Sequence, residues 1–134
     1  MRREDFDQLV ERAFRRIPFR FRKEMQNVLI TVEDEPSRRQ LAAGRVTRGG
    51  TLLGLYEGRP LPMRSVGDSF QLPDRITIFQ RPIERASAGA AELERMVYDT
   101  LWHEVAHYFG MDETQVRRAE WRRSRDRLRR RLNP

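Results

Sequence analysis

Cysteine is absent from the 134 residues of this sequence. Its absence excludes disulfide bonds, thiolate metal ligands and a thiol nucleophile. Long apolar runs are also missing, because no segment approaches the roughly 18 apolar residues that a membrane-spanning helix needs. The chain begins with Met1-Arg2-Arg3-Glu4-Asp5, without the apolar segment of a secretory signal. We therefore expect a cytoplasmic, single-domain protein with no membrane partner.

Lysine and histidine are also scarce. Of the 27 basic residues only Lys23 is a lysine, and the net charge is +7. Residues 117–134 hold nine arginines against Glu120 and Asp126, so this segment alone accounts for the net charge. Such a segment predicts weak contact with a nucleic acid or an acidic partner, with Trp121 available for stacking. A solvated helix is the favoured interpretation, because no base-reading motif accompanies the charge.

The pattern of apolar residues indicates an α+β fold. We expect a single compact domain with a small sheet of three to four short strands and helices packed on one side of it. Residues 34–50 are expected to form a connecting loop. The predicted helices span residues 5–17, with Asp5 as N-cap, residues 89–109, ending at Gly110, and residues 112–131; the predicted strands span residues 28–32, 52–56 and 76–79.

Both histidines of the chain lie in the segment Trp102-His103-Glu104-Val105-Ala106-His107. Residues four apart stand on the same face of a helix, with Cβ atoms roughly 5–6 Å apart. His103 and His107 can therefore bind one Zn²⁺ through imidazole nitrogens. Glu104 can reach a water on that metal and act as a general base, since zinc lowers the pKa of such a water to about 7. The same string also arises by chance, but here it contains the chain's only histidines, which favours a metal site.

Two imidazoles leave a zinc ion short of a third protein ligand. Gly110 can adopt a positive φ and turn the chain back towards the metal. Glu113 is the favoured ligand, Asp112 is the alternative and Glu120 is a further candidate. Asp112 and Glu113 also have an ordinary interpretation, as acids that stabilise the first turn of the next helix.

Three stretches make the sequence resemble the minimal-zincin family of small zincin-like metallopeptidases: residues 53–61 (L-G-L-Y-E-G-x-P-L), 72–79 (L-P-D-R-I-T-I-F) and 100–111 (T-L-W-H-E-V-A-H-Y-F-G-M). The resemblance covers residues 5–121 and implies a compact α+β zincin-like domain. It also implies that His103 and His107 are metal ligands and that Glu104 is the general base. The family's pattern has an aspartate at the position of Glu113, with Asp112 just before it here, so the third ligand stays open.

Substrate contacts can be predicted only coarsely. In zincin-like enzymes an edge strand near the metal binds an extended peptide through its main chain. Strand 52–56 or strand 76–79 could serve here, although a core strand is the favoured interpretation of each one taken singly. Tyr56, Tyr98 and Tyr108 are candidate oxyanion donors, and half-buried structural tyrosines are the ordinary alternative.

These observations favour a zinc-dependent hydrolase that acts on a peptide or protein substrate. In this hypothesis His103, His107 and Glu113 hold Zn²⁺ and Glu104 activates water. A second hypothesis is a catalytically silent metal-binding domain, and a third is a nucleic-acid-binding protein in which the histidine motif is incidental. We expect the metallopeptidase domain to span residues 1–121 and an Arg-rich helical tail to span residues 122–134.

Overall fold

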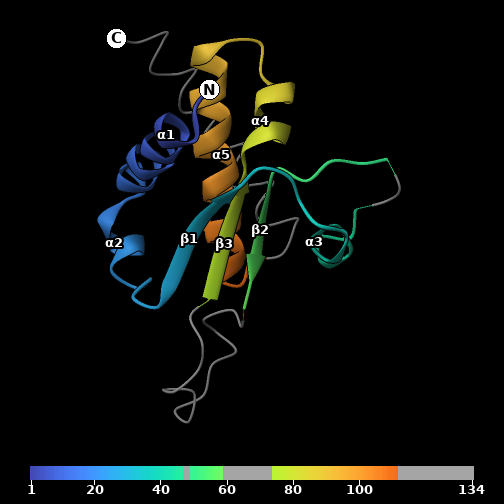
Figure 1. Cartoon of the computed structure of the whole chain (residues 1–134). Coiled ribbons are helices and arrows are strands. Elements are labelled where there is room, and N and C mark those ends of the chain that lie inside the picture. The colour runs from blue at the N-terminus through green and yellow to red at the C-terminus, as the bar shows by residue number, and fades with distance from the viewer. Residues whose placement is uncertain (47–48, 59–73, 112–134) are drawn as a thin grey trace, which may run out of the picture.

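A computed structural model of the chain describes residues 1–46, 49–58 and 74–111. Two long helices, α1 (Arg3–Arg16) and α5 (Ala90–Tyr108), lie beside a small sheet (Figure 1). Three short helices complete the described helical elements: α2 (Phe19–Arg22), α3 (Arg38–Ala43) and α4 (Gln80–Ala86). None of the helices in these ranges is both long and apolar enough to cross a membrane.

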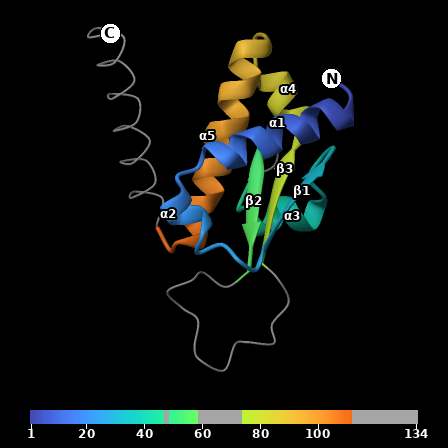
Figure 2. The same cartoon turned by 90° about the vertical axis from the view of Figure 1, so that its left-hand side faces the viewer.

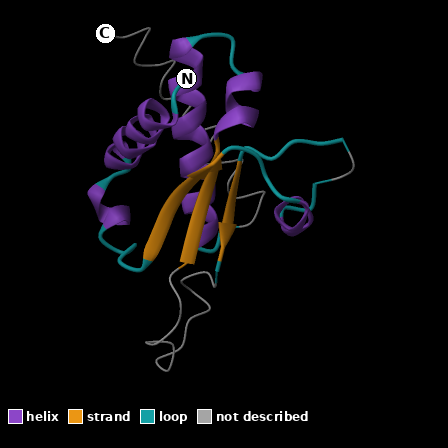
Figure 3. Cartoon of the chain, in the orientation of Figure 1, coloured by secondary structure: helices purple, strands orange, loops and turns teal. Residues whose placement is uncertain are grey.

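The sheet contains β1 (Val28–Glu33), β2 (Gly54–Glu57) and β3 (Asp74–Phe79), in the order β1-β3-β2. β1 pairs with β3 in parallel and β2 pairs with β3 antiparallel. Among the described strands, β3 is therefore central and β2 lies at an edge. Figure 3 shows the three strands as one continuous sheet among the helices. This arrangement confirms the predicted α+β class.

The core lies between the sheet and the two long helices. Amphipathic α1 buries residues spaced three or four apart, as expected for one helical face. α5 buries a matching stripe, and β3 contributes Ile76 and Ile78. Burial of these side chains fixes α5 against the sheet, which positions the face that carries the histidines. The core members from the long helices are Phe6, Leu9, Val10, Ala13, Leu93, Val97, Leu101, Val105 and Tyr108.

The long periodic segments fold as predicted, with differences at their ends. The first helix begins at Arg3, so Asp5 lies inside the first turn. The prediction of Asp5 as N-cap is wrong, because Arg2 occupies that position without a side-chain capping bond. The second strand begins at Gly54 and not at residue 52, whereas the strand predicted at 76–79 begins earlier, at Asp74.

Three short helices depart from the predictions. The segment expected to be a loop over residues 34–50 contains α3, which begins with a capping box between Ser37 and Gln40. α3 lies on the opposite side of the sheet from α5 (Figure 2), so helices are not confined to one side. The sequence pattern does not predict α2 or α4 either. The helix predicted at 112–131 and the tail from residue 122 lie outside the described residues.

Candidate metal centre

His103 and His107 lie side by side on α5. Their ring centroids are 4.9 Å apart and the ring planes meet at 68°. Both side chains are partly exposed, whereas Leu101 and Val105 on the inner face of the helix are fully buried. The buried residues hold α5 against the core, and the one-turn spacing leaves both imidazoles on an accessible face. The predicted juxtaposition of the two rings is present.

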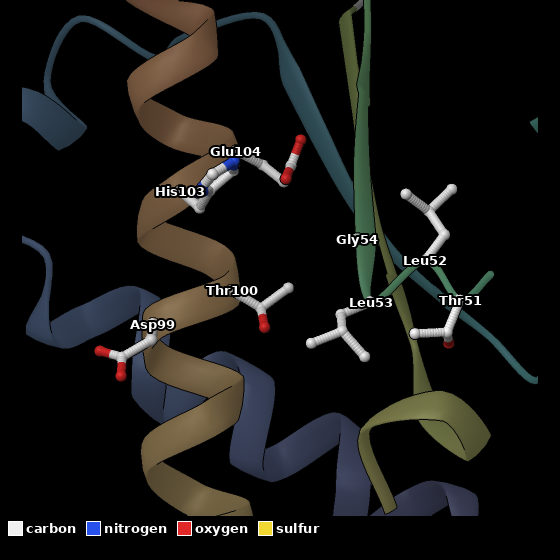
Figure 4. A pocket seen from close by; sticks show the side chains of 8 residues that line it. All are labelled: Thr51, Leu52, Leu53, Gly54, Asp99, Thr100, His103 and Glu104. Carbon is white, nitrogen blue, oxygen red and sulfur yellow. The ribbon is translucent and has the colours of Figure 1, made fainter. Parts of the chain in front are cut away.

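Glu104 lies one residue round the helix from His103 and points towards the sheet. Its side chain projects from α5 towards β2 (Figure 4), and the residue is only 7% exposed. The Tyr56 amide N–H donates a hydrogen bond to the Glu104 Oε1 at 2.9 Å. A buried carboxylate needs such a partner, and a backbone donor restricts its orientation. The carboxylate is therefore held between the helix and strand β2.

Gly54 allows the helix to approach the strand closely. A Cβ atom at this position would lie 2.8 Å from the Thr100 Cγ2, 3.3 Å from the Glu104 Cγ and 3.3 Å from the Thr77 carbonyl oxygen. The first distance is shorter than ordinary van der Waals contact, so only glycine fits without a shift. This close approach brings the Glu104 carboxylate within reach of the Tyr56 amide. Sequence reasoning missed both contacts.

His103, Glu104 and His107 form one cluster of potential ligand atoms. One atom from each residue can be chosen so that all three lie within 4.8 Å of one another. Two imidazole nitrogens and a carboxylate oxygen are suited to a borderline transition metal such as zinc. Among the described residues, this is the cluster that could hold a metal ion.

Gly110 ends α5 as predicted. Its φ is +81°, a left-handed conformation that glycine adopts without a Cβ penalty. The Gly110 N–H donates to the His107 carbonyl at 2.9 Å, and the Met111 N–H donates to the Ala106 carbonyl at 3.1 Å. These two bonds form a Schellman motif, which turns the chain directly after the second histidine. Glu113, Asp112 and Glu120, the predicted third-ligand candidates, lie outside the described residues.

A sequence model of zincin-like metallopeptidases matches residues 25–122, which is more than half of the chain. The chain belongs to the zincin-like metallopeptidase family. The match includes β1 to β3 and all of α5, and α1 lies outside it. Membership implies a metal ion, in agreement with the cluster on α5.

A solved structure has a similar fold. It is a conserved hypothetical protein from Thermus thermophilus, with 25% sequence identity and a TM-score of 0.53. The similarity covers 80% of this zincin-like chain and 92% of that protein. No curated protein matches the sequence.

The sheet order distinguishes the two strands proposed for peptide binding in this zincin-like domain. β3 is paired on both sides and cannot accept another strand. β2 is at an edge, and its Tyr56 amide already contacts Glu104. Only β2 of these two strands can extend the sheet beside the cluster.

The three tyrosines make structural contacts, two of them through their hydroxyls. The Tyr56 hydroxyl donates to the buried Asp74 carboxylate at 2.6 Å, and the Tyr108 hydroxyl donates to the Glu24 carbonyl at 2.8 Å. For the third tyrosine it is the ring that is engaged, because the Arg16 guanidinium lies 4.3 Å above the Tyr98 ring. These contacts favour structural roles for the three tyrosines over oxyanion stabilisation.

A pocket adjoins the cluster, between α5 and the segment that leads into β2 (Figure 4). Its volume is about 320 Å³. The pocket shares His103 and Glu104 with the metal cluster, so any group bound in it would lie beside the candidate reacting centre. The described residues that line it are Thr51, Leu52, Leu53, Gly54, Asp99, Thr100, His103 and Glu104.

Proposed function

We propose that this zincin-like protein is a zinc-dependent peptidase. In this proposal His103 and His107 supply two nitrogen ligands, and Glu113 supplies the third protein ligand, with Asp112 as the alternative. Glu104 is the general base. The observation that carries the proposal is the cluster in which ligand atoms of His103, Glu104 and His107 lie within 4.8 Å of one another.

The chemistry of the cluster fits hydrolysis. Zinc, when bound, supplies the Lewis acidity that makes a water molecule nucleophilic near neutral pH. Glu104 takes a proton from the attacking water as the water oxygen adds to the peptide carbonyl. The same carboxyl passes the proton to the departing nitrogen as the C–N bond breaks, which yields a carboxylate and an amine. The hydrogen bond from the Tyr56 amide holds the Glu104 carboxylate in the orientation that this proton transfer requires.

The edge of β2 provides a place for an extended peptide or protein segment. The Phe79 N–H donates to the Leu53 carbonyl at 2.9 Å, so Leu53 directs that carbonyl towards β3. In an antiparallel pair the next residue directs its main-chain groups to the other side. The main chain of Gly54 therefore faces outward, beside Glu104. An added strand could use these groups and bring its scissile bond to the cluster.

Metal analysis separates the ligand role proposed for His103 from the base role proposed for Glu104. Wild-type protein and Glu104→Ala, each dialysed against excess zinc and then against buffer, should retain about one zinc per chain. His103→Ala should retain much less, because one imidazole ligand is lost. Loss of zinc from Glu104→Ala as well would make Glu104 a ligand, contrary to the proposed base role.

Hydrolysis tests the reaction itself. Zinc-loaded wild-type protein should cleave a fluorescently labelled unfolded protein or a mixture of peptides, and chelation should stop the cleavage. Glu104→Gln should lower kcat by about 10²- to 10⁴-fold, because the amide cannot accept the proton. If the wild-type chain binds zinc but cleaves nothing in such mixtures, the domain is a silent metal-binding module and the peptidase proposal fails.

A further inference from the structure

Tyr56 is held at both of its ends by carboxylates. Its main-chain N–H donates to the Glu104 Oε1 at 2.9 Å, and its hydroxyl donates to the Asp74 Oδ2 at 2.6 Å. The second distance is short for a hydrogen bond between two oxygens, so the hydroxyl has a well-defined partner. One residue therefore connects the carboxylate proposed as the general base with a second buried carboxylate.

The pairing of β2 with β3 does not fix the Tyr56 amide. In an antiparallel pair successive residues direct their main-chain groups to opposite sides. The Leu53 carbonyl accepts from the Phe79 N–H, so the main chain of Tyr56, three residues later, faces away from β3. β2 ends at Glu57, the very next residue. The amide that holds Glu104 therefore lies on the outer side of an edge strand, close to the end of that strand.

Asp74 connects this strand end to the middle of the sheet. It is the first residue of β3, it pairs with Val28 of β1, and its N–H donates to the Asn27 carbonyl at 3.0 Å. The residue is only 4% exposed. A buried carboxylate is costly unless it accepts hydrogen bonds, so the Tyr56 hydroxyl and Asp74 stabilise each other. The bond between them restrains Tyr56 from the side chain, where the sheet does not restrain its amide.

Gly58 leaves the space in which this bond forms. Glu57 pairs with Arg75, so the next residue of the chain, Gly58, falls opposite Asp74. A Cβ atom on Gly58 would lie 2.9 Å from the Asp74 Cβ and would overlap the carboxyl group. Because glycine has no such atom, the Asp74 side chain can pass across this position to the Tyr56 hydroxyl.

We propose that Asp74 is a positioning residue for the general base. It holds the Tyr56 hydroxyl, and the Tyr56 main chain in turn holds the Glu104 carboxylate. The inference rests on the proposed peptidase function, because that function gives Glu104 the role of base. Removal of a group that orients the residues of a metal centre typically costs about 10- to 100-fold in activity or metal affinity. Here the loss should fall on kcat, because neither histidine is part of the connection.

The mildest test removes one oxygen atom. Tyr56→Phe loses the hydroxyl and keeps the ring that packs against Tyr108 at 6.0 Å between centroids. With zinc-loaded protein and a quenched-fluorescence peptide, kcat should fall about 10- to 100-fold while KM and zinc content stay unchanged. Asp74→Ala should act in the same way. Asp74→Asn, which keeps an oxygen acceptor for the hydroxyl, should recover most of the lost kcat.

A double variant and a control separate positioning from general damage. Tyr56→Phe/Asp74→Ala should be no worse in kcat than the poorer single variant, because both changes break the same bond. The control is Gln80→Leu, which removes equally buried hydrogen bonds to Met1 and Arg3 and should leave kcat unchanged. Additive losses in the double variant, or an equal loss of kcat in the control, would overturn the inference.

Hydrogen exchange tests the connection without catalysis. In metal-free protein the amide of residue 56 should exchange about tenfold faster in Tyr56→Phe and Asp74→Ala than in the wild type, because a freed strand end opens more often. The rate is compared with that of the Val97 amide in α5, which reports global unfolding. Faster exchange in a chain whose wild type cleaves no peptide would refute the peptidase function and leave the connection standing. Unchanged exchange of residue 56 in both variants would overturn the positioning role.

Discussion

Gly54 shows how a residue with no side chain can position the carboxylate proposed as the general base. We predict that Gly54→Ala pushes β2 and α5 apart, because its Cβ would lie 2.8 Å from the Thr100 Cγ2. Overpacking of this kind costs about 1–3 kcal/mol of folding free energy. Displacement of Glu104 should lower kcat by about 10²-fold. Hydrogen exchange of the Tyr56 amide, which now donates to Glu104, should become faster.

A second substitution distinguishes displacement from general damage. Thr100→Ser removes the methyl group that the new Cβ would meet, so the double variant Gly54→Ala/Thr100→Ser should recover part of the activity and of the amide protection. Thr100→Ser alone is the control and should change both only slightly. If the double variant is no better than Gly54→Ala, the contact with Thr100 is not the cause.

The histidine–glutamate cluster could be predicted from sequence, but its backbone partners could not. Two histidines four residues apart on a helix share a face whatever the rest of the fold does. Glu104 depends on the Tyr56 amide, which is 48 positions away in the sequence. Every residue except proline carries such a donor, so no residue type identifies it. Only the packing of α5 against β2 reveals the contact.

At the scale of elements, the long helices and the strands carry periodic signals and the short helices do not. α1 and α5 show apolar residues at helical spacing, and β1 and β3 are rich in β-branched and apolar residues. α3 is polar and is held by local and tertiary bonds, among them the bond from the Gln40 Nε2 to Glu33 at 3.0 Å. Its capping box, Ser37-x-x-Gln40, is the sequence signal that could have found it.

The end of α5 gives a prediction at the same scale. Gly110→Ala must adopt a φ of +81° with a Cβ atom present, at a cost of about 1 kcal/mol. The Schellman bonds to His107 and Ala106 should weaken, and the last turn should fray. We expect a lower free energy of unfolding in urea and weaker zinc binding, because His107 lies in that turn. Gly49→Ala is a matched control, because Gly49 has a similar φ of +83° and a Cβ added there would meet no atom within 4 Å, and it should affect stability alone.

For the whole molecule, metal binding should be linked to folding. A ligand that binds only the native state stabilises it by about 2.7 kcal/mol when its free concentration is a hundredfold above Kd. Zinc should therefore raise the melting temperature of the wild-type chain by several degrees. Calorimetry of the chain with zinc, and again with a chelator, measures this difference. His103→Ala should show almost no zinc-dependent shift; an equal shift in that variant would place the stabilising metal elsewhere.

Net charge divides the molecule into two parts with different expected behaviour. Residues 117–134 carry the whole net charge of +7, and the rest of the chain is balanced. We propose that this segment attracts nucleic acids or other polyanions through counterion release, without sequence preference. The full chain should bind labelled single-stranded DNA with an affinity that falls steeply as salt rises, whereas a chain lacking residues 122–134 should bind far more weakly.

The zinc content and peptide cleavage of the shortened chain should stay unchanged, since the cluster lies on α5. Equal DNA retention by both chains would show that the arginines do not carry the attraction, and loss of zinc on shortening would instead give the segment a role in the metal centre.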